Sequence, residues 1–139
     1  HDPLVALKKI YRLLKPDGLL IFTTPNLDSL DARLFGPFWI GYDLPRHLQV
    51  FSYRTMRILT DKSGFRILDV RCLYGSYAAA ASSIRFWMRA KHRDAKWLTM
   101  GERALFALPL RILAAPYFFV MDKLRLSSAL TVTCVKTGW

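Results

Sequence analysis

The stretch that decides the fold is Asp2–Asn26, with the sequence DPLVALKKIYRLLKPDGLLIFTTPN. Its first apolar residues recur at helical spacing, which predicts a helix over residues 3–15. Pro16 and Gly18 then end that helix. The nearly unbroken apolar run after them predicts a strand over residues 19–24. A run of this kind is typical of a strand that is covered on both faces, as in a parallel α/β sheet.

The remainder of the chain continues the alternation of helices and strands. Ser52 is a good N-cap for a helix over residues 53–63. Interleaved apolar residues predict two further strands, over residues 66–74 and 129–136. The segment between them, residues 76–128, holds an alanine-rich stretch and a long apolar run, which predict a helical segment. The sequence as a whole therefore predicts an α/β fold.

Several short motifs follow one another in the first half of the chain. They are Leu13–Gly18, Thr24–Asn26, Arg33–Gly36, Trp39, Asp43–Leu48, Phe51–Ser52, Leu59 and Lys62–Phe65. In this order they resemble the second half of the class I S-adenosylmethionine-dependent methyltransferases, in a small bacterial branch. The resemblance covers residues 1–75 and extends to the last strand. It implies the C-terminal half of a Rossmann-like methyltransferase sheet, a mixed sheet whose last strand lies between the other two and antiparallel to both.

The glycine-rich cofactor loop of that family has no counterpart here, since the sequence contains no G-x-G pattern. The resemblance therefore implies the C-terminal part of a methyltransferase, with residues 1–75 and 129–139 as a partial core and residues 76–128 as an insertion. The missing N-terminal half is the expected partner. S-adenosylmethionine is the expected cofactor of the longer protein, and we expect this part alone not to bind it. The expected location is the cytoplasm, and peripheral association with the inner face of the membrane is a further option.

The site residues that the resemblance implies lie at the end of the first strand and in the loop over residues 26–50. In the family this loop lies over the acceptor pocket, so His47 is the candidate catalytic base, because an imidazole exchanges protons near neutral pH. The candidate substrate-binding residues are Thr24, Asn26, Trp39, Tyr42 and Arg46. The alternative is that Asp43, Arg46 and His47 only hold the loop together, while its aromatic residues anchor it. No residue is predicted to bind a metal ion or the cofactor.

The chain carries a net charge of +11, with more of the excess after residue 75 than before it. A basic surface is typical of proteins that bind anionic lipid, nucleic acid or an acidic ligand. The apolar run over residues 104–121 is flanked by Trp97, Tyr117, Lys96, Arg103, Lys123 and Arg125. This pattern predicts either a helical lid packed on the core or a hairpin at an anionic membrane surface. Nucleic acid fits less well, because the aromatic residues lie among aliphatic runs.

These observations favour the acceptor side of a methyltransferase that acts on a small-molecule or lipid-like acceptor. The alternative is a non-catalytic interaction or membrane-docking module built on a degenerate methyltransferase core. The first strand would have an unpaired edge in such a part, which favours self-association. Cys72 and Cys134 fall in the last two predicted strands, where the thiols could approach each other, but two free thiols in a reducing compartment are the simpler expectation.

Overall fold

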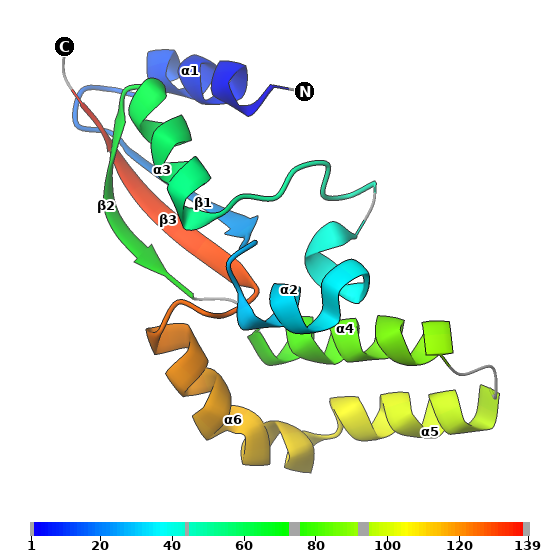
Figure 1. Cartoon of the computed structure of the whole chain (residues 1–139). Coiled ribbons are helices and arrows are strands. Elements are labelled where there is room, and N and C mark those ends of the chain that lie inside the picture. Colours follow the sequence, from blue (N-terminus) through cyan, green and yellow to red (C-terminus); the bar gives the residue numbers. More distant parts are fainter. Residues whose placement is uncertain (1, 44, 73–75, 92–94, 138–139) are drawn as a thin grey trace.

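Figure 1 shows a three-stranded sheet with helices against one face and a helical arm beyond its end. The structure, a computed structural model, describes residues 2–43, 45–72, 76–91 and 95–137. The α-helices are α1 (Pro3–Leu13), α2 (Leu30–Phe35), α3 (Tyr53–Lys62), α4 (Ser76–Lys91), α5 (Ala95–Phe106) and α6 (Leu108–Lys123). The strands are β1 (Leu19–Pro25), β2 (Phe65–Arg71) and β3 (Ala129–Lys136).

The strands lie in the order β1-β3-β2, and β3 runs antiparallel to both of its neighbours. This confirms the order and the direction predicted for the last strand. Both strand pairings in the described sheet are antiparallel. The predicted mixed, Rossmann-like sheet also needs parallel pairings, and the described strands form none. A β-bulge between Ile67 and Asp69 interrupts the register of β2 with β3, and such a bulge twists an edge strand away from further pairing.

One face of the sheet carries the hydrophobic core, because α1 and α3 both pack against it. The buried members of this core are Leu7, Met56, Phe65, Val70, Leu130, Val132 and Cys134. The Tyr11 ring meets Phe65 edge-on, with ring centroids 5.5 Å apart. The Tyr11 hydroxyl donates a 2.6 Å hydrogen bond to the carbonyl of Thr137, which ties α1 to the end of β3.

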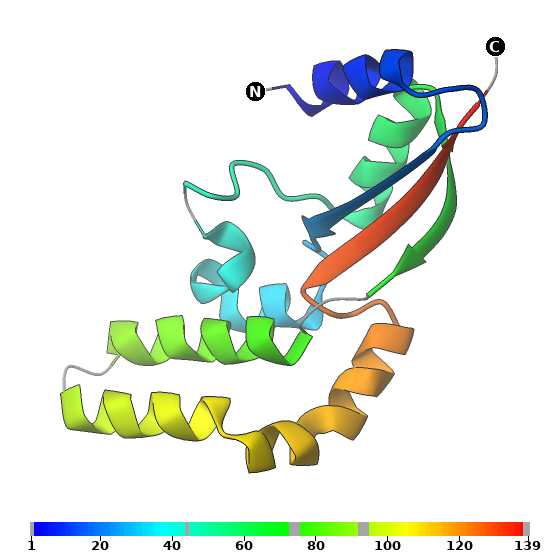
Figure 2. The same ribbon diagram turned by 180° about the vertical axis from the view of Figure 1, so that it is seen from behind.

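The other face of the sheet is open, as the view from behind shows (Figure 2). Leu19 and Ile21 of β1 are 54% and 62% exposed, and Leu68 of β2 is 49% exposed. The prediction that the first strand is covered on both faces is therefore wrong for the described chain. Both covering helices lie on the side of Leu20 and Phe22, so the alternate residues of β1 have no helix to pack against.

Two predicted boundaries differ from the structure by more than one residue. Helix α1 ends at Leu13, earlier than predicted, because the next residue already has an extended backbone ahead of Pro16. The second strand spans Phe65–Arg71, whereas the prediction continued to residue 74. Residues 73–75 lie outside the described part of the chain.

The loop over residues 26–50 is a folded unit between the sheet and the arm. It contains α2 and two single turns of 3-10 helix, Gly36–Phe38 and Ile40–Tyr42. The Ile40 amide donates a 3.0 Å hydrogen bond to Ser83 Oγ, which attaches the loop to α4.

The helical insertion that we expected between the last two strands is present as α4, α5 and α6. Helices α4 and α5 lie side by side, and α6 turns back from them toward the end of the sheet (Figures 1 and 2). An ion pair of 2.6 Å joins Arg89 of α4 to Glu102 of α5. The Tyr77 hydroxyl of α4 donates to the Leu105 carbonyl of α5, and the Tyr77 ring meets Phe118 of α6 edge-on.

Candidate functional site

The polar groups of Asn26, just after β1, are all hydrogen-bonded within the protein. Its amide nitrogen donates to the carbonyls of Arg125 at 3.1 Å and Ser127 at 3.0 Å. Its side-chain oxygen accepts a hydrogen bond from the Asp28 amide at 3.1 Å. The residue is only 1% exposed, and a satisfied buried amide of this kind makes the local structure rigid. Asn26 therefore joins the end of β1 to the segment that enters β3.

Trp39 is buried where the loop meets the start of β3. Its indole nitrogen donates a 3.1 Å hydrogen bond to Ser128 Oγ, and that hydroxyl in turn donates to the carboxylate of Asp31. Tyr42 packs edge-on against the Trp39 ring, with centroids 5.1 Å apart, and is 41% exposed. The polar atom of Trp39 is thus engaged within the protein, whereas Tyr42 is the member of the aromatic pair that reaches the surface.

Asp31 is a buried acid that our sequence analysis did not single out. Burial raises the pKa of Asp31, although the hydrogen bond from Ser128 opposes that change. Desolvation has this direction because it penalises the charged carboxylate. In the sequence, Asp31 looks like an ordinary acidic residue in the first turn of a helix capped by Ser29, so only its tertiary contacts reveal the altered pKa.

Arg46 and His47 lie on the turn that follows the second 3-10 helix. Arg46 forms an ion pair of 3.2 Å with Asp43, and its side chain is 79% exposed. The backbone amide of His47 donates to the Asp43 carbonyl at 3.0 Å. The Nδ1 atom of His47 is buried, and no described residue forms a hydrogen bond with it. Unsatisfied buried nitrogens are uncommon in proteins, so this imidazole stands out as a candidate functional group.

The structure places four of the six predicted residues in two groups. Asn26 and Trp39 both bond the segment just before β3, whereas Arg46 and His47 gather at the turn around the Asp43 backbone. Thr24 is buried at the end of β1, and within the described part of the chain its hydroxyl donates only to the carbonyl of the next residue, at 3.4 Å. Tyr42 lies between the two groups in the sequence, and its ring contacts Trp39 of the first group.

The described residues do not fit S-adenosylmethionine as a bound cofactor. In α/β sheets a ligand meets polar groups at the ends of strands. At the end of β1, however, the amide of Asn26 is fully bonded and Thr24 is buried. The sequence also lacks a G-x-G loop, through which backbone amides approach a ligand closely. Across the described ranges, no three His, Cys, Asp or Glu side chains are grouped so that they could hold a metal ion.

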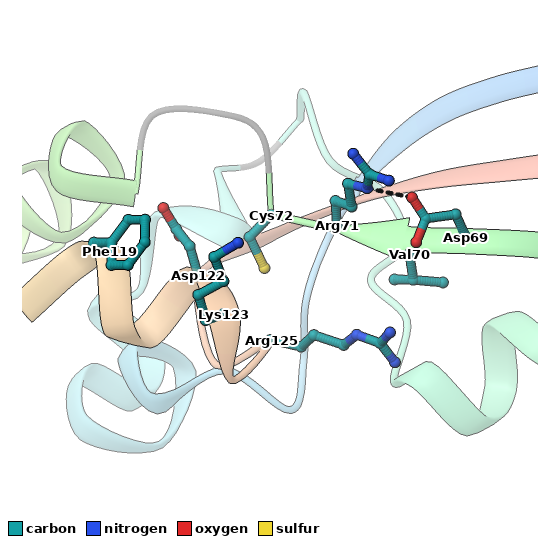
Figure 3. A pocket seen from close by; sticks show the side chains of 8 residues that line it. All are labelled: Asp69, Val70, Arg71, Cys72, Phe119, Asp122, Lys123 and Arg125. Carbon is teal, nitrogen blue, oxygen red and sulfur yellow. Dashed lines mark ion pairs between the residues drawn. The ribbon is translucent and has the colours of Figure 1, made fainter.

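A cavity of about 580 Å³ lies between the end of β2 and the end of α6 (Figure 3). Its lining residues are Asp69, Val70, Arg71, Cys72, Phe119, Asp122, Lys123 and Arg125. Both carboxylates are engaged, since Asp69 pairs with Arg71 and Asp122 accepts hydrogen bonds from the hydroxyls of Ser76 and Ser127. Neither Lys123 nor Arg125 forms an ion pair with another described residue. The cavity therefore has two cations available to an anion, and we call it the α6 pocket.

Cys72 forms part of the wall of the α6 pocket. Burial raises the pKa of the Cys72 thiol, while hydrogen bonding with Ser127 opposes this change. Burial also raises the pKa of Cys134, to about 11. Both cysteines are free thiols, as expected, and they lie toward opposite ends of the pairing between β2 and β3.

The local sequence does not reveal the α6 pocket, because the two walls of the pocket are far apart in the chain. In the sequence, the cations at the end of the long apolar run are only charges that flank it. Nothing in the local pattern of residues 69–72 indicated that β2 would end beside them. The clustering of Lys123 and Arg125 was the one usable signal.

A family model described as a methyltransferase domain matches residues 1–70, half of the chain. Among solved structures, the chain is similar to a candidate sarcosine dimethylglycine methyltransferase from Galdieria sulphuraria, with a TM-score of 0.47 and 14% sequence identity. The similarity covers 98% of this chain and 48% of that one, so the present chain spans about half the length of that protein. No curated protein matches the chain.

Proposed function

The chain belongs to the family of methyltransferase domains, and we propose that it forms the acceptor-binding part of a methyltransferase that uses S-adenosylmethionine. The family match over residues 1–70 carries this proposal, because it includes β1 and the whole loop over residues 26–50. The free Nδ1 of His47 and the exposed ring of Tyr42 support an acceptor site in that loop.

The free edge of β1 and the open sheet face support a partner that binds the cofactor. Within the described residues, β1 pairs along one edge only, with β3. Leu19 and Ile21 are exposed on the open face. An unpaired edge beside exposed apolar residues favours pairing with a further strand. We propose that a cofactor-binding half, outside these residues, supplies that strand, and that a second copy of this chain pairs there when the half is absent.

In this proposal the cofactor supplies the methyl group, and the present chain holds and deprotonates the acceptor. His47 takes the proton of the acceptor at Nδ1, the buried nitrogen that has no hydrogen-bond partner among the described residues. Tyr42 and Arg46 contact the acceptor, since both belong to this loop and reach the surface. Asn26 and Trp39 fix the position of the loop through their hydrogen bonds to the segment before β3. Acceptors of this site are small molecules or lipid-like compounds.

The substitution His47→Gln tests the proposed proton transfer in a methyltransferase that contains both halves. It should lower kcat by roughly 10²–10⁴-fold, the usual contribution of a general base. The Kd for S-adenosylmethionine should stay unchanged, because His47 lies on the acceptor side. Steady-state kinetics and calorimetry measure the two quantities.

The matched control is Asp43→Asn, which removes the ion pair to Arg46 and keeps the imidazole. If the turn only needs these residues to hold its shape, both variants should lose activity together with thermal stability. Full activity of the His47→Gln enzyme would contradict the role of His47 as a base.

A non-catalytic interaction or membrane-docking module is the second candidate function. The observation that favours it is the poor fit of the described residues to S-adenosylmethionine. Calorimetric titration with S-adenosylmethionine separates the candidates when this chain and a longer protein with the cofactor-binding half are compared. Binding by the longer protein supports the enzyme, and the absence of binding by either supports the module.

A further inference from the structure

The outward side of α6 is almost wholly apolar. Leu108, Ile112, Leu113 and Phe119 are 64–78% exposed there, and none of the residues of α6 is buried. Two charged residues of α6 lie against α4 instead. Arg111 lies over the Tyr77 ring, and Asp122 accepts a hydrogen bond from Ser76. A helix of a water-soluble domain normally has the opposite arrangement, with its apolar side inward.

Helix α5 also exposes large apolar side chains. Trp97, Met100 and Phe106 are 66%, 57% and 43% exposed. Within the described residues no single helix is long and apolar enough to cross a membrane. One pair of consecutive helical segments reaches that length and apolar composition together, but it is bent by 59°: Trp97–Phe106 and Leu108–Lys123. Exposed aromatic residues beside a bent apolar pair are typical of helices that lie in a membrane interface.

The α6 pocket places cations at the edge of the apolar surface. Phe119 lines the pocket, and the Lys123 ammonium lies 5.4 Å from the centre of its ring. Arg125 lines the same pocket and forms no ion pair with a described residue. Lysine and arginine side chains are the usual ligands of phosphate groups. An apolar helix side that ends at two such cations matches the two ends of a phospholipid.

We propose that α6 docks on an anionic phospholipid bilayer, with its outward side in the acyl region and with lipid phosphates bound by Lys123 and by Arg125, whose charged groups point to different sides of the α6 pocket (Figure 3). Residues 76–128 contain nine lysines and arginines against three acidic residues, so the whole arm is attracted to such a surface. A second copy of the chain is a poorer occupant, because a symmetric interface would bring these cations against themselves. The proposal holds whether or not the chain takes part in methyl transfer.

Vesicle co-sedimentation tests the charge requirement. The purified protein should bind vesicles of phosphatidylcholine with phosphatidylglycerol more tightly than vesicles of phosphatidylcholine alone. The double substitution Lys123→Gln/Arg125→Gln should weaken binding to the anionic vesicles by about 30-fold. Its matched control, Lys8→Gln/Lys9→Gln, removes the same charge from α1 at the other end of the molecule (Figure 1) and should leave binding nearly unchanged.

A second pair of variants tests the apolar side. Ile112→Gln/Leu113→Gln should weaken binding to both kinds of vesicle by at least about tenfold, because these side chains no longer enter the acyl region. The matched control is Leu13→Gln/Leu34→Gln, since these leucines are 85% and 72% exposed outside the arm. Circular dichroism of all four proteins checks that each one is folded.

Three outcomes would overturn the proposal. In the first, the folded protein binds no vesicle, and calorimetry shows that the α6 pocket binds only inorganic phosphate. The second is an equal loss of binding in the two charge variants, which would mean that overall charge, and no pocket, attracts the protein. The third is an oligomer seen by sedimentation velocity without lipid and abolished by Ile112→Gln/Leu113→Gln, which would make a second copy the occupant.

Discussion

Helix α3 has a mostly polar sequence and buries Met56 and Thr60 against the sheet, whereas the apolar helix α6 buries none of its residues. The difference lies in their neighbours. Helix α3 faces β2 and β3 across a shared core, while the main contacts of α6 are with α4 and α5. Burial in this chain therefore depends on what lies opposite a helix, and an apolar sequence by itself does not guarantee it.

The largest expected effect tests this comparison by making the same change, phenylalanine to alanine, once in the core and once on α6. Phe65→Ala removes a ring that is 2% exposed in the core and should lower the free energy of unfolding by about 3–5 kcal/mol. Phe119→Ala removes a ring that is 64% exposed on α6 and should change it by less than about 0.5 kcal/mol. Urea unfolding followed by circular dichroism, without lipid, measures both. Similar losses in the two variants would show that the outward side of α6 is packed in solution.

A smaller effect should separate two tryptophans. Trp39→Phe removes the hydrogen bond to Ser128 from a buried site and should lower stability by about 1–3 kcal/mol. Trp97→Phe changes a residue that is 66% exposed on α5 and should have almost no effect on stability. Urea unfolding under the same conditions measures both changes. An unchanged Trp39→Phe protein would mean that the indole contributes only its volume.

The smallest effect concerns the pH dependence of stability. Because burial raises the pKa of Asp31, the folded state binds its proton more tightly than the unfolded state does. The free energy of unfolding should therefore fall as the pH rises from 3.8, the ordinary pKa of an aspartate, through the raised pKa of folded Asp31. Asp31→Asn cannot ionise, so the variant should gain stability relative to the parent between acidic and neutral pH. Urea unfolding over that range checks this, and parallel curves would contradict it.

Local patterns were sufficient for much of the fold. Helical spacing placed α1 and α3, and Ser52 was correctly expected to cap α3, where its hydroxyl accepts a hydrogen bond from the Thr55 amide. The motif order indicated the family, and with it the position of β3 between β1 and β2. These features depend on residues that are close in sequence or on a sequence order that the family shares.

The candidate site was less predictable from the sequence. His47 was singled out as a proton acceptor, but only the fold shows that its Nδ1 is buried without a partner among the described residues. Asn26 looked like a residue that presents polar groups, whereas the structure commits its amide to carbonyls near β3. Asp31 had no local signal at all. Each of these facts depends on groups that the sequence places far apart.

The sequence by itself determined the elements of this protein, their family and the basic, apolar character of the segment before β3. Tertiary structure alone decided which apolar residues are covered, namely one face of the sheet and the inner side of the arm. It also brought the end of β2 to Lys123 and Arg125 and so formed the α6 pocket. The physical reason is that secondary structure follows from near neighbours in the chain, whereas burial, hydrogen-bond satisfaction and charge pairing depend on whatever the folded chain places opposite each group.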